Sequence, residues 1–318
     1  MNILVYGAGV LGSLYAARLQ EAGQHVSLLA RGKRLQDIRE HGIVLEDVLT
    51  GQTTTTHVQV VEQLGSADQY DLAVVVMGKH QVAAIFPRLA ANKQIPSVLF
   101  LHNNAAGPQA MIEALGLERV LLGFPGAGGK REGHIIHSLL IKQQPTTLGE
   151  LDGRTTQRLE QIANAFKDAG FPIAVSSNID AALKTHAVFI SCLESAVIVA
   201  GGNHELASRR DLLLLMVSAI RQGFKGLQAR GLPIVPFNLK LMFLGMPQWF
   251  PVLYWQRALQ SKLGEYSLAA HANAAPGEIR QLIDEISTLV RDTSVSTPAM
   301  DQLYGDIDAI STSMRLCQ

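Results

Sequence analysis

Cysteine is scarce in this chain of 318 residues, and neither sign of charge is in excess. The two cysteines, Cys192 and Cys317, are too few for a disulfide framework and resemble no metal site. Lys plus Arg and Asp plus Glu number 27 each, so no general affinity for nucleic acid or for an acidic membrane surface is indicated. We therefore expect a cytoplasmic protein whose partners include neither nucleic acid nor membrane.

Long apolar runs are also missing. Residues 188–200 are strongly apolar, but the stretch is too short to span a bilayer and contains Glu194. The N-terminus enters a predicted strand directly, without the basic and hydrophobic regions of a secretion signal. With 47% hydrophobic residues, the composition predicts a soluble enzyme of two domains, each with a sizeable core.

A glycine-rich turn near the N-terminus is the most informative motif. It reads Gly7-Ala8-Gly9-Val10-Leu11-Gly12, between a predicted buried strand over 2–6 and a predicted helix over 13–21. The first glycine permits a tight turn, the second lets a diphosphate approach the backbone, and the third lets the helix pack closely on the strand. The N-terminus of that helix would face the phosphates. The motif in this context predicts a dinucleotide site.

A cluster of basic residues follows the second predicted strand and indicates which dinucleotide binds. An NAD enzyme has an acidic residue here for the ribose 2′-hydroxyl, but this chain has Arg31, Lys33 and Arg34. A guanidinium pairs with a 2′-phosphate, which an acid would repel. We therefore predict NADP as cofactor, with Arg31 as a ligand. The alternative is that the three basic residues form an ordinary solvated turn.

Strands alternate with helices in the first half of the chain, and helices follow in the second. Further strands are predicted at 71–77, 97–102, 120–123, within 134–149 and at 171–175, and long helices at 179–200, 209–229 and 276–290. This order predicts an α/β N-terminal Rossmann domain with a doubly wound, mostly parallel sheet over residues 1–176. An all-α C-terminal domain for substrate binding or dimerisation is expected over 177–318, with the active site between the domains.

Two polar residues stand just after predicted strands of the first domain. Lys79 follows the strand over 71–77, where its ammonium group would reach the cofactor or an anionic substrate. Asn103 follows the strand over 97–102, where its amide would donate to a substrate carbonyl. The alternatives are an exposed loop lysine and an asparagine required only by a turn.

The chain resembles the ketopantoate reductases, also called 2-dehydropantoate 2-reductases. The motifs that carry the resemblance are Gly7 to Gly12, Arg31, Lys79, His102-Asn103, Leu148-Gly149-Glu150, Ala169-Gly170, Asn178-Ile179 and Gly277-Glu278-Ile279. The resemblance implies reduction of a 2-oxo acid with NADPH, with 2-dehydropantoate to pantoate as the family reaction. It also implies that Arg31 binds the 2′-phosphate, that Lys79 and Asn103 line the nicotinamide and substrate, and that Glu278 is an active-site acid.

The sequence departs from this family in the helix after Asn178. The family has a catalytic lysine there, then an asparagine four residues on and another four beyond it. An ungapped reading places His186, Ile190 and Glu194 at those positions. Lys184 is near, but two residues turn a helix by about 200°, which directs it away from that face.

Ketone reduction needs a proton donor for the carbonyl oxygen and a polar group for the substrate carboxylate. We predict His186 as the donor, because an imidazole titrates near neutral pH, and Glu278 as its partner. Along one helix, Glu194 would lie about 12 Å from His186, so we place it in substrate binding instead. The alternative is that His186 and Glu194 have structural roles only.

The remaining candidates are weaker. His134 and His137 are expected on opposite faces of one strand, which makes joint metal ligation improbable, so no metal is predicted. Four aromatic residues at 249, 250, 254 and 255 are expected to pack in the core rather than to line the pocket or a dimer contact. We predict an NADPH-dependent 2-oxo acid reductase that can form a homodimer. The alternatives are a non-catalytic NADPH-binding protein and a reductase of another small carbonyl compound.

Overall fold

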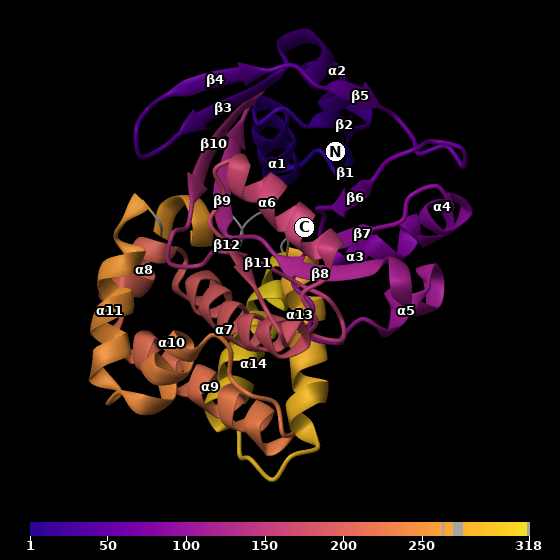
Figure 1. Ribbon diagram of the computed structural model, residues 1–318. Helices are drawn as coiled ribbons and strands as arrows, with labels where there is room; N and C mark the ends of the chain where they lie inside the picture. The colour runs from indigo at the N-terminus through magenta and orange to yellow at the C-terminus, as the bar shows by residue number, and fades with distance from the viewer. Residues whose placement is uncertain (263, 270–275, 317–318) are drawn as a thin grey trace. The chain divides into compact units, whose positions relative to one another are not determined.

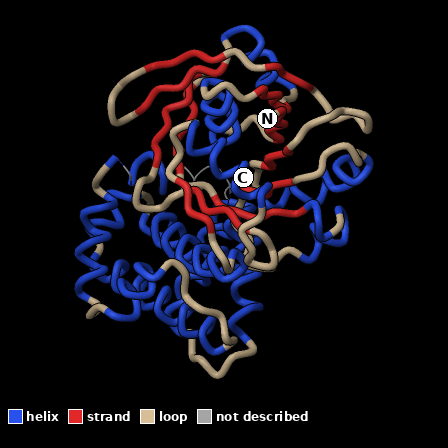
Figure 2. The backbone as a smooth tube through the Cα atoms, in the orientation of Figure 1, coloured by secondary structure: helices blue, strands red, loops and turns tan. Residues whose placement is uncertain are grey.

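The computed structural model describes residues 1–262, 264–269 and 276–316, and Cys317 lies outside them. The chain forms two compact units. The α/β unit consists of Met1–Asn103 and Pro108–Asp180, and the helical unit consists of Asn104–Gly107 and the chain from Ala181 onward. Figure 2 shows the strands, in red, confined to the first of these.

The α/β unit contains every strand among the described residues. They are β1 (Asn2–Tyr6), β2 (His25–Leu29), β3 (Ile43–Asp47), β4 (Thr53–Thr56), β5 (Gln59–Val61), β6 (Leu72–Val75), β7 (Val98–Leu101), β8 (Val120–Phe124), β9 (Ala127–Glu132), β10 (Ile135–Leu140), β11 (Thr146–Gly149) and β12 (Ile173–Val175). Its helices are α1 (Val10–Glu21), α2 (Gly32–His41), α3 (Lys79–Val82), α4 (Phe86–Ala91), α5 (Gln109–Leu115) and α6 (Gln157–Asp168), with short 3-10 turns η1 (Ala83–Ile85) and η2 (Leu117–Arg119).

The helical unit is built from longer helices. They are α7 (Ile179–Ala200), which begins at the end of the α/β unit, α8 (Asn203–Ser208), α9 (Arg210–Ala229), α10 (Phe237–Lys240), α11 (Trp249–Leu259), α13 (Pro276–Arg291) and α14 (Pro298–Leu316), with π-helical turns η3 (Leu241–Gly245) and η4 (Gly264–Ala269).

The main sheet has eight strands in the order β12-β11-β8-β7-β6-β1-β2-β5 (Figure 1). Its neighbouring strands are parallel, except that β11 runs antiparallel to β8. The chain leaves β1 for β2 on one side and later returns to β6 on the other, so the strand order reverses beside β1. A crevice at such a reversal is where doubly wound sheets bind ligands. The predicted fold class, a Rossmann domain followed by helices, is confirmed.

A second sheet was not predicted. It has four strands in the order β4-β3-β10-β9, and α1 contacts both this sheet and the main sheet. The prediction that 134–149 only completes the main sheet is therefore wrong for β10, which pairs with β3 and β9. The polar sequence of β4, four consecutive threonines, explains why hydrophobic periodicity gave no signal there.

Helix α7 contributes to the apolar core of the helical unit. It is long and apolar enough to cross a membrane by length and composition alone, but 78% of its most apolar window is buried in the protein. Ala187, Cys192 and Leu193 belong to the apolar core that α7 shares with α9 and α14. We assign α7 to the core of a globular unit, and cytoplasmic location stays a prediction.

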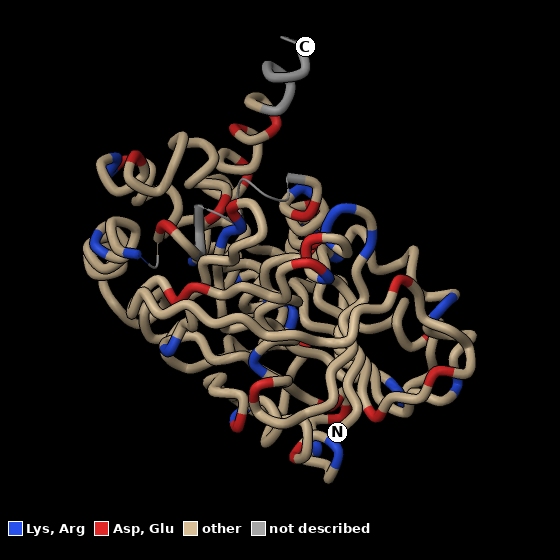
Figure 3. The backbone as a smooth tube through the Cα atoms, turned by 90° about the horizontal axis from the view of Figure 1, so that it is seen from above, with Lys and Arg blue, Asp and Glu red and all other residues tan. Residues whose placement is uncertain are grey.

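The aromatic residues of α11 divide between core and surface. Trp255 is buried, as predicted, and its ring lies tilted against that of Phe189 with the ring centroids 5.2 Å apart. The same prediction is wrong for Trp249, Phe250 and Tyr254, of which Trp249 is 57% exposed. Acidic and basic residues are interspersed along the described chain (Figure 3). Homodimer formation stays a prediction.

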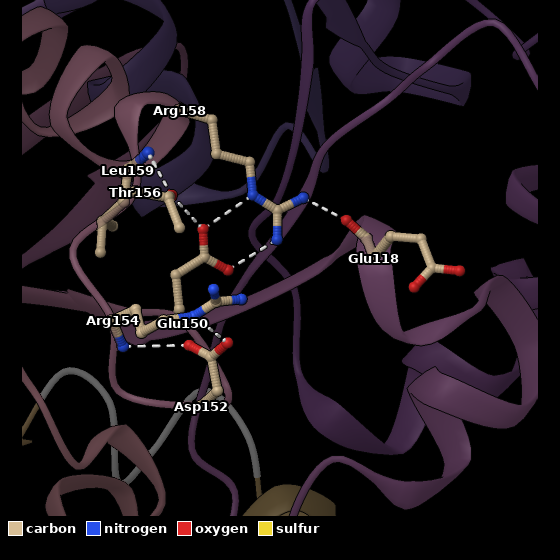
Figure 4. A network of polar contacts seen from close by, with 7 residues as sticks. All are labelled: Glu118, Glu150, Asp152, Arg154, Thr156, Arg158 and Leu159. Atoms are coloured by element: carbon tan, nitrogen blue, oxygen red, sulfur yellow. Dashed lines mark hydrogen bonds and ion pairs between the residues drawn. The ribbon is translucent and has the colours of Figure 1, made fainter.

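A buried ion pair joins the end of the main sheet to α6 (Figure 4). Glu150 is only 4% exposed. Its carboxylate accepts hydrogen bonds from Nε of Arg158 at 2.7 Å and from Nη2 at 2.6 Å. It also accepts a hydrogen bond from Thr156, whose hydroxyl oxygen caps α6 by accepting from Leu159 N. Burial alone would raise the pKa of Glu150, but the bonds from Arg158 and Thr156 outweigh it and hold the pKa below its ordinary value.

This depressed pKa predicts a specific acid sensitivity. The ion pair contributes stability above the unfolded-state pKa of Glu150, about 4.3, and this stability is lost as pH falls through the lower folded-state pKa. We expect Glu150→Gln to lower the free energy of unfolding at pH 7 and to flatten its decline below about pH 5. Urea unfolding between pH 7 and pH 3 measures both effects. Glu160→Gln, at an exposed acidic residue of α6, the helix that contains Arg158, is the control. Parallel pH curves for the protein and Glu150→Gln would contradict the assignment.

Candidate functional site

The predicted site residues of the α/β unit follow the carboxyl ends of parallel strands. The glycine turn follows β1, Arg31 comes two residues after β2, and Lys79 begins α3 beyond β6. Asn103 comes two residues after β7. The registers Tyr6 to Leu29, Tyr6 to Val75 and Val75 to Phe100 place these strand ends at one edge of the sheet. The structure thus brings the glycine turn, Arg31, Lys79 and Asn103 to the same edge.

The glycine turn is tight where the fold requires it and open where a ligand would approach. Gly7 has φ +121°, and a Cβ there would lie 2.4 Å from the Val76 carbonyl oxygen. A Cβ on Gly12 would lie 1.8 Å from the Gly7 carbonyl oxygen. By contrast, a Cβ on Gly9 would meet no atom within 4 Å. Gly9 is the N-cap of α1 and no side chain caps this helix, so its first N–H groups remain available to an anion.

Two hydrogen bonds hold the Arg34 side chain against this turn. The sequence did not predict this contact. Nε of Arg34 donates to the Ala8 carbonyl at 3.2 Å and its Nη2 to the Ser13 hydroxyl at 3.0 Å. The buried Nη1 has no hydrogen-bond partner among the residues the structure describes. Burial and the charge of Arg131 lower the pKa of Arg34. Arg31 and Lys33, the other two members of the basic cluster, are exposed.

These features fit a phosphorylated dinucleotide. The open side of Gly9 gives room for a diphosphate, and the exposed guanidinium of Arg31 gives a cation at the end of β2. The spare donor of Arg34 adds a second cationic group beside the same turn. No residue in the first turn of α1 or α2 is acidic, so nothing there would repel a phosphate.

Lys79 and Asn103 lie in ordered surroundings. Lys79 is half-buried, and Asn103 is buried with 9% exposure. The ring nitrogen Nδ1 of His102 lies 2.8 Å from the carbonyl oxygen of Asn103, which fixes the backbone there. Asn104, the next residue, has no positive φ, since the only described residues with positive φ are glycines. The backbone at Asn104 is therefore unstrained.

The predicted residues of the helical unit are all buried. His186 is 6% exposed, Glu194 1% and Glu278 7%. Since α7 runs without a break from 179 to 200, His186 and Glu194 are two turns apart, about 12 Å along the axis. Lys184 is on another side of α7, beside Arg230 and Asp292 at a surface hollow. A pairing of His186 with Glu278 stays a prediction.

Metal binding and nucleophilic chemistry concern two histidines, His134 and His137, and the described cysteine, and the structure places each of them. No group of three or more His, Cys, Asp or Glu residues in the described part of the chain is placed to hold a metal ion. His134 stacks on His41, whereas His137 lies between Glu46 and Glu132. Burial raises the pKa of the Cys192 thiol to about 12, so this cysteine is protonated and unsuited to act as a nucleophile.

Comparison with known proteins finds one family to which the first half of the chain is similar. Residues 3–153 match the sequence model described as ketopantoate reductase PanE/ApbA. A 2-dehydropantoate 2-reductase of Archaeoglobus fulgidus is 26% identical over 181 residues, which are 56% of this chain and 57% of that protein. One of Listeria monocytogenes is 24% identical over 203 residues, 63% of each chain. This chain is similar to the ketopantoate reductases. The matches span about three fifths of the length of these relatives.

Solved structures extend the likeness to the whole fold. The 2-dehydropantoate 2-reductase of Geobacter metallireducens has a TM-score of 0.78 at 18% identity and covers 98% of this chain and 100% of its own. D-mandelate dehydrogenase with NADH and anilino(oxo)acetate has a TM-score of 0.80 at 17% identity, covering 99% and 100%. At these identities the likeness establishes the ketopantoate reductase fold alone.

Replacement by alanine should have different effects at two glycines of the turn, on stability at Gly12 and on ligand binding at Gly9. Gly12→Ala should lower the free energy of unfolding by about 1–3 kcal/mol, because its methyl group collides with the Gly7 carbonyl. Gly9→Ala should leave stability within about 0.5 kcal/mol but weaken NADPH binding, because its methyl group fills the open side of the turn. Chemical unfolding and calorimetric titration measure the two effects. Unaltered NADPH affinity of Gly9→Ala would show that the dinucleotide does not approach this turn.

Proposed function

We propose that this protein is an NADPH-dependent reductase of a small 2-oxo acid, with 2-dehydropantoate as the first substrate to test. The observation that carries the proposal is the cationic edge of the sheet. An open glycine turn, Arg31 and the spare donor of Arg34 lie at the strand ends where a doubly wound fold binds its dinucleotide. The match of residues 3–153 to the ketopantoate reductase family supports the same reaction class.

The α/β unit would hold the cofactor. The N–H groups at the start of α1 would face the diphosphate, and Arg31 would pair with the 2′-phosphate that distinguishes NADPH from NADH. Lys79 and Asn103 lie at the ends of β6 and β7, where the nicotinamide and the substrate are expected. When bound, the reduced nicotinamide supplies a hydride to the substrate carbonyl carbon.

The helical unit would supply the proton. Hydride addition leaves negative charge on the carbonyl oxygen, which an acid must neutralise. We assign this role to His186, with Glu278 as the carboxylate that orients its ring, and we assign Glu194 to substrate binding. Asn103 would donate its amide N–H groups to the substrate carbonyl oxygen. An imidazolium is a suitable donor near neutral pH, since its ordinary pKa is about 6.5.

A second candidate is a protein that binds NADPH without reducing a carbonyl compound. Partly buried Ile190, at one asparagine position of the family helix, favours it, because an aliphatic side chain cannot bind a hydroxy acid by hydrogen bonds. Turnover of NADPH with any member of a panel of 2-oxo acids decides for the reductase. Tight NADPH binding with no turnover of any of them decides for the second candidate.

Arg31→Ala tests the choice of cofactor. Losing a charge-assisted pair with the 2′-phosphate should weaken NADPH binding about ten- to a hundredfold. NADH affinity should stay within about twofold, because NADH has no phosphate there. Titration calorimetry with each nucleotide measures both constants. Arg39→Ala, which removes a surface arginine of α2 that pairs with Glu62, is the control. Equal weakening for both nucleotides would contradict recognition of the phosphate.

His186→Ala tests the proton donor. Removing a general acid should lower kcat about a hundredfold or more while NADPH affinity stays nearly intact. Because the family has lysine at this position, His186→Lys should retain much of the turnover that His186→Ala loses. His204→Ala, at an exposed histidine of α8, is the control. Steady-state kinetics with the best 2-oxo acid gives kcat. An undiminished kcat in His186→Ala, or an equal loss of turnover and NADPH binding, would assign His186 a structural role.

A further inference from the structure

The turn that follows Asn103 is anchored by a carboxylate from a distant part of the chain. Oε2 of Glu285, in α13, accepts hydrogen bonds from the backbone N–H groups of Ala105 and Ala106, each at 3.1 Å. The other oxygen, Oε1, accepts from Gln281 Nε2 at 3.0 Å, which orients the carboxylate. Bonds from two N–H groups to one charged oxygen are stronger than bonds between neutral groups.

The anchored turn is itself closed. Oδ1 of Asn104 accepts from Gly107 N at 3.0 Å, and its Nδ2 donates to the Gly107 carbonyl at 2.9 Å. Ala105 is 1% exposed and belongs to the apolar core of the helical unit. Residues 104–107 thus pack as part of the helical unit, although the segments on either side of them belong to the α/β unit. Glu285 therefore holds a compact, ordered turn.

The position of this turn in the chain connects it to the proposed chemistry. Asn103, proposed to bind the substrate carbonyl, is covalently joined to Asn104 at the start of the turn. Glu278, proposed to orient the proton donor, lies two helical turns before Glu285 on the same helix. A shift of the turn would change the direction of the Asn103 amide, and small displacements of such groups lower rates strongly.

We propose that Glu285 is a positioning residue for Asn103. Its carboxylate fixes the 104–107 turn on α13, and the fixed turn holds the Asn103 amide in the orientation that substrate reduction needs. Glu285 lines a surface hollow together with both basic and acidic residues. These are Lys184, Arg230, Asp284 and Asp292. This inference rests on the proposed function for its catalytic part and on the hydrogen bonds from Ala105 and Ala106 to Glu285 for its structural part.

Glu285→Ala is the first test. We expect kcat for the 2-oxo acid to fall about tenfold or more and its KM to rise, with NADPH affinity within about twofold of the original. Glu285→Gln, which keeps a carbonyl oxygen for the two N–H groups, should recover much of the loss. Asp284→Ala, at the neighbouring exposed carboxylate of α13, is the matched control and should change neither constant. A melting temperature for each variant shows that it is folded.

Hydrogen exchange supplies a readout that does not depend on turnover. The Ala105 and Ala106 amides should exchange slowly in the protein and in Asp284→Ala, and clearly faster in Glu285→Ala. Unchanged exchange would overturn the anchor, and faster exchange with unchanged kcat and KM would overturn the positioning role. If the protein itself reduces no 2-oxo acid, the proposed function fails separately. The NMR signal of the Asn103 side-chain amide then decides, because the shift that NADPH causes should differ between the protein and Glu285→Ala, and an identical shift in both would overturn the positioning role.

Discussion

The close approach of α1 to β1 is the constraint on which the cofactor half of this protein depends. No side-chain atom fits between Gly12 and the Gly7 carbonyl, where a Cβ would lie 1.8 Å from the oxygen. With this contact made, α1 begins directly after β1, and its N-cap Gly9 has no atom within 4 Å of the position that a Cβ would occupy. Helix α1 also contacts the second sheet, so the helix that the glycine turn begins packs against both sheets of the α/β unit.

Residues that are far apart in sequence lie together at the carboxyl edge of the main sheet. Parallel strands end at the same edge, so polar residues that follow β1, β2, β6 and β7 become neighbours. Arg34 strengthens this edge by binding Ala8 and Ser13, which ties α2 to the glycine turn. The fold thereby concentrates positive charge in one place, although the whole chain has equal numbers of acidic and basic residues.

Local patterns made much of the fold predictable. Helix α7 occupies the predicted residues 179–200, because a segment of this length with helical periodicity and without glycine or proline favours a helix over a strand. The strand ends before Lys79 and Asn103 were predictable because apolar runs stop at polar turns. The second sheet was not predictable, because the sequence of β9, Ala-Gly-Gly-Lys-Arg-Glu, has no apolar alternation. Strand β9 is stabilised by pairing with β10 and by contact with α1, and α1 lies outside any local window of the sequence around β9.

The site was predictable only where one segment supplies it. The glycine turn and Arg31 form a motif within the first 31 residues, so their chemistry can be read locally. The contact of Glu285 with Ala105 joins residues 180 positions apart, and no periodicity signals it. The departures at His186, Ile190 and Glu194 were visible in the sequence, but the roles of the replacements depend on partners from other elements. Those roles stay predictions.

A crystal structure of this protein with NADPH tests the central claim most directly. The account predicts the 2′-phosphate within about 3 Å of the Arg31 guanidinium and the diphosphate against the backbone at Gly9. The nicotinamide should lie near Lys79 and Asn103. A cofactor bound with its 2′-phosphate away from Arg31, or a diphosphate bound elsewhere than at the glycine turn, would contradict it.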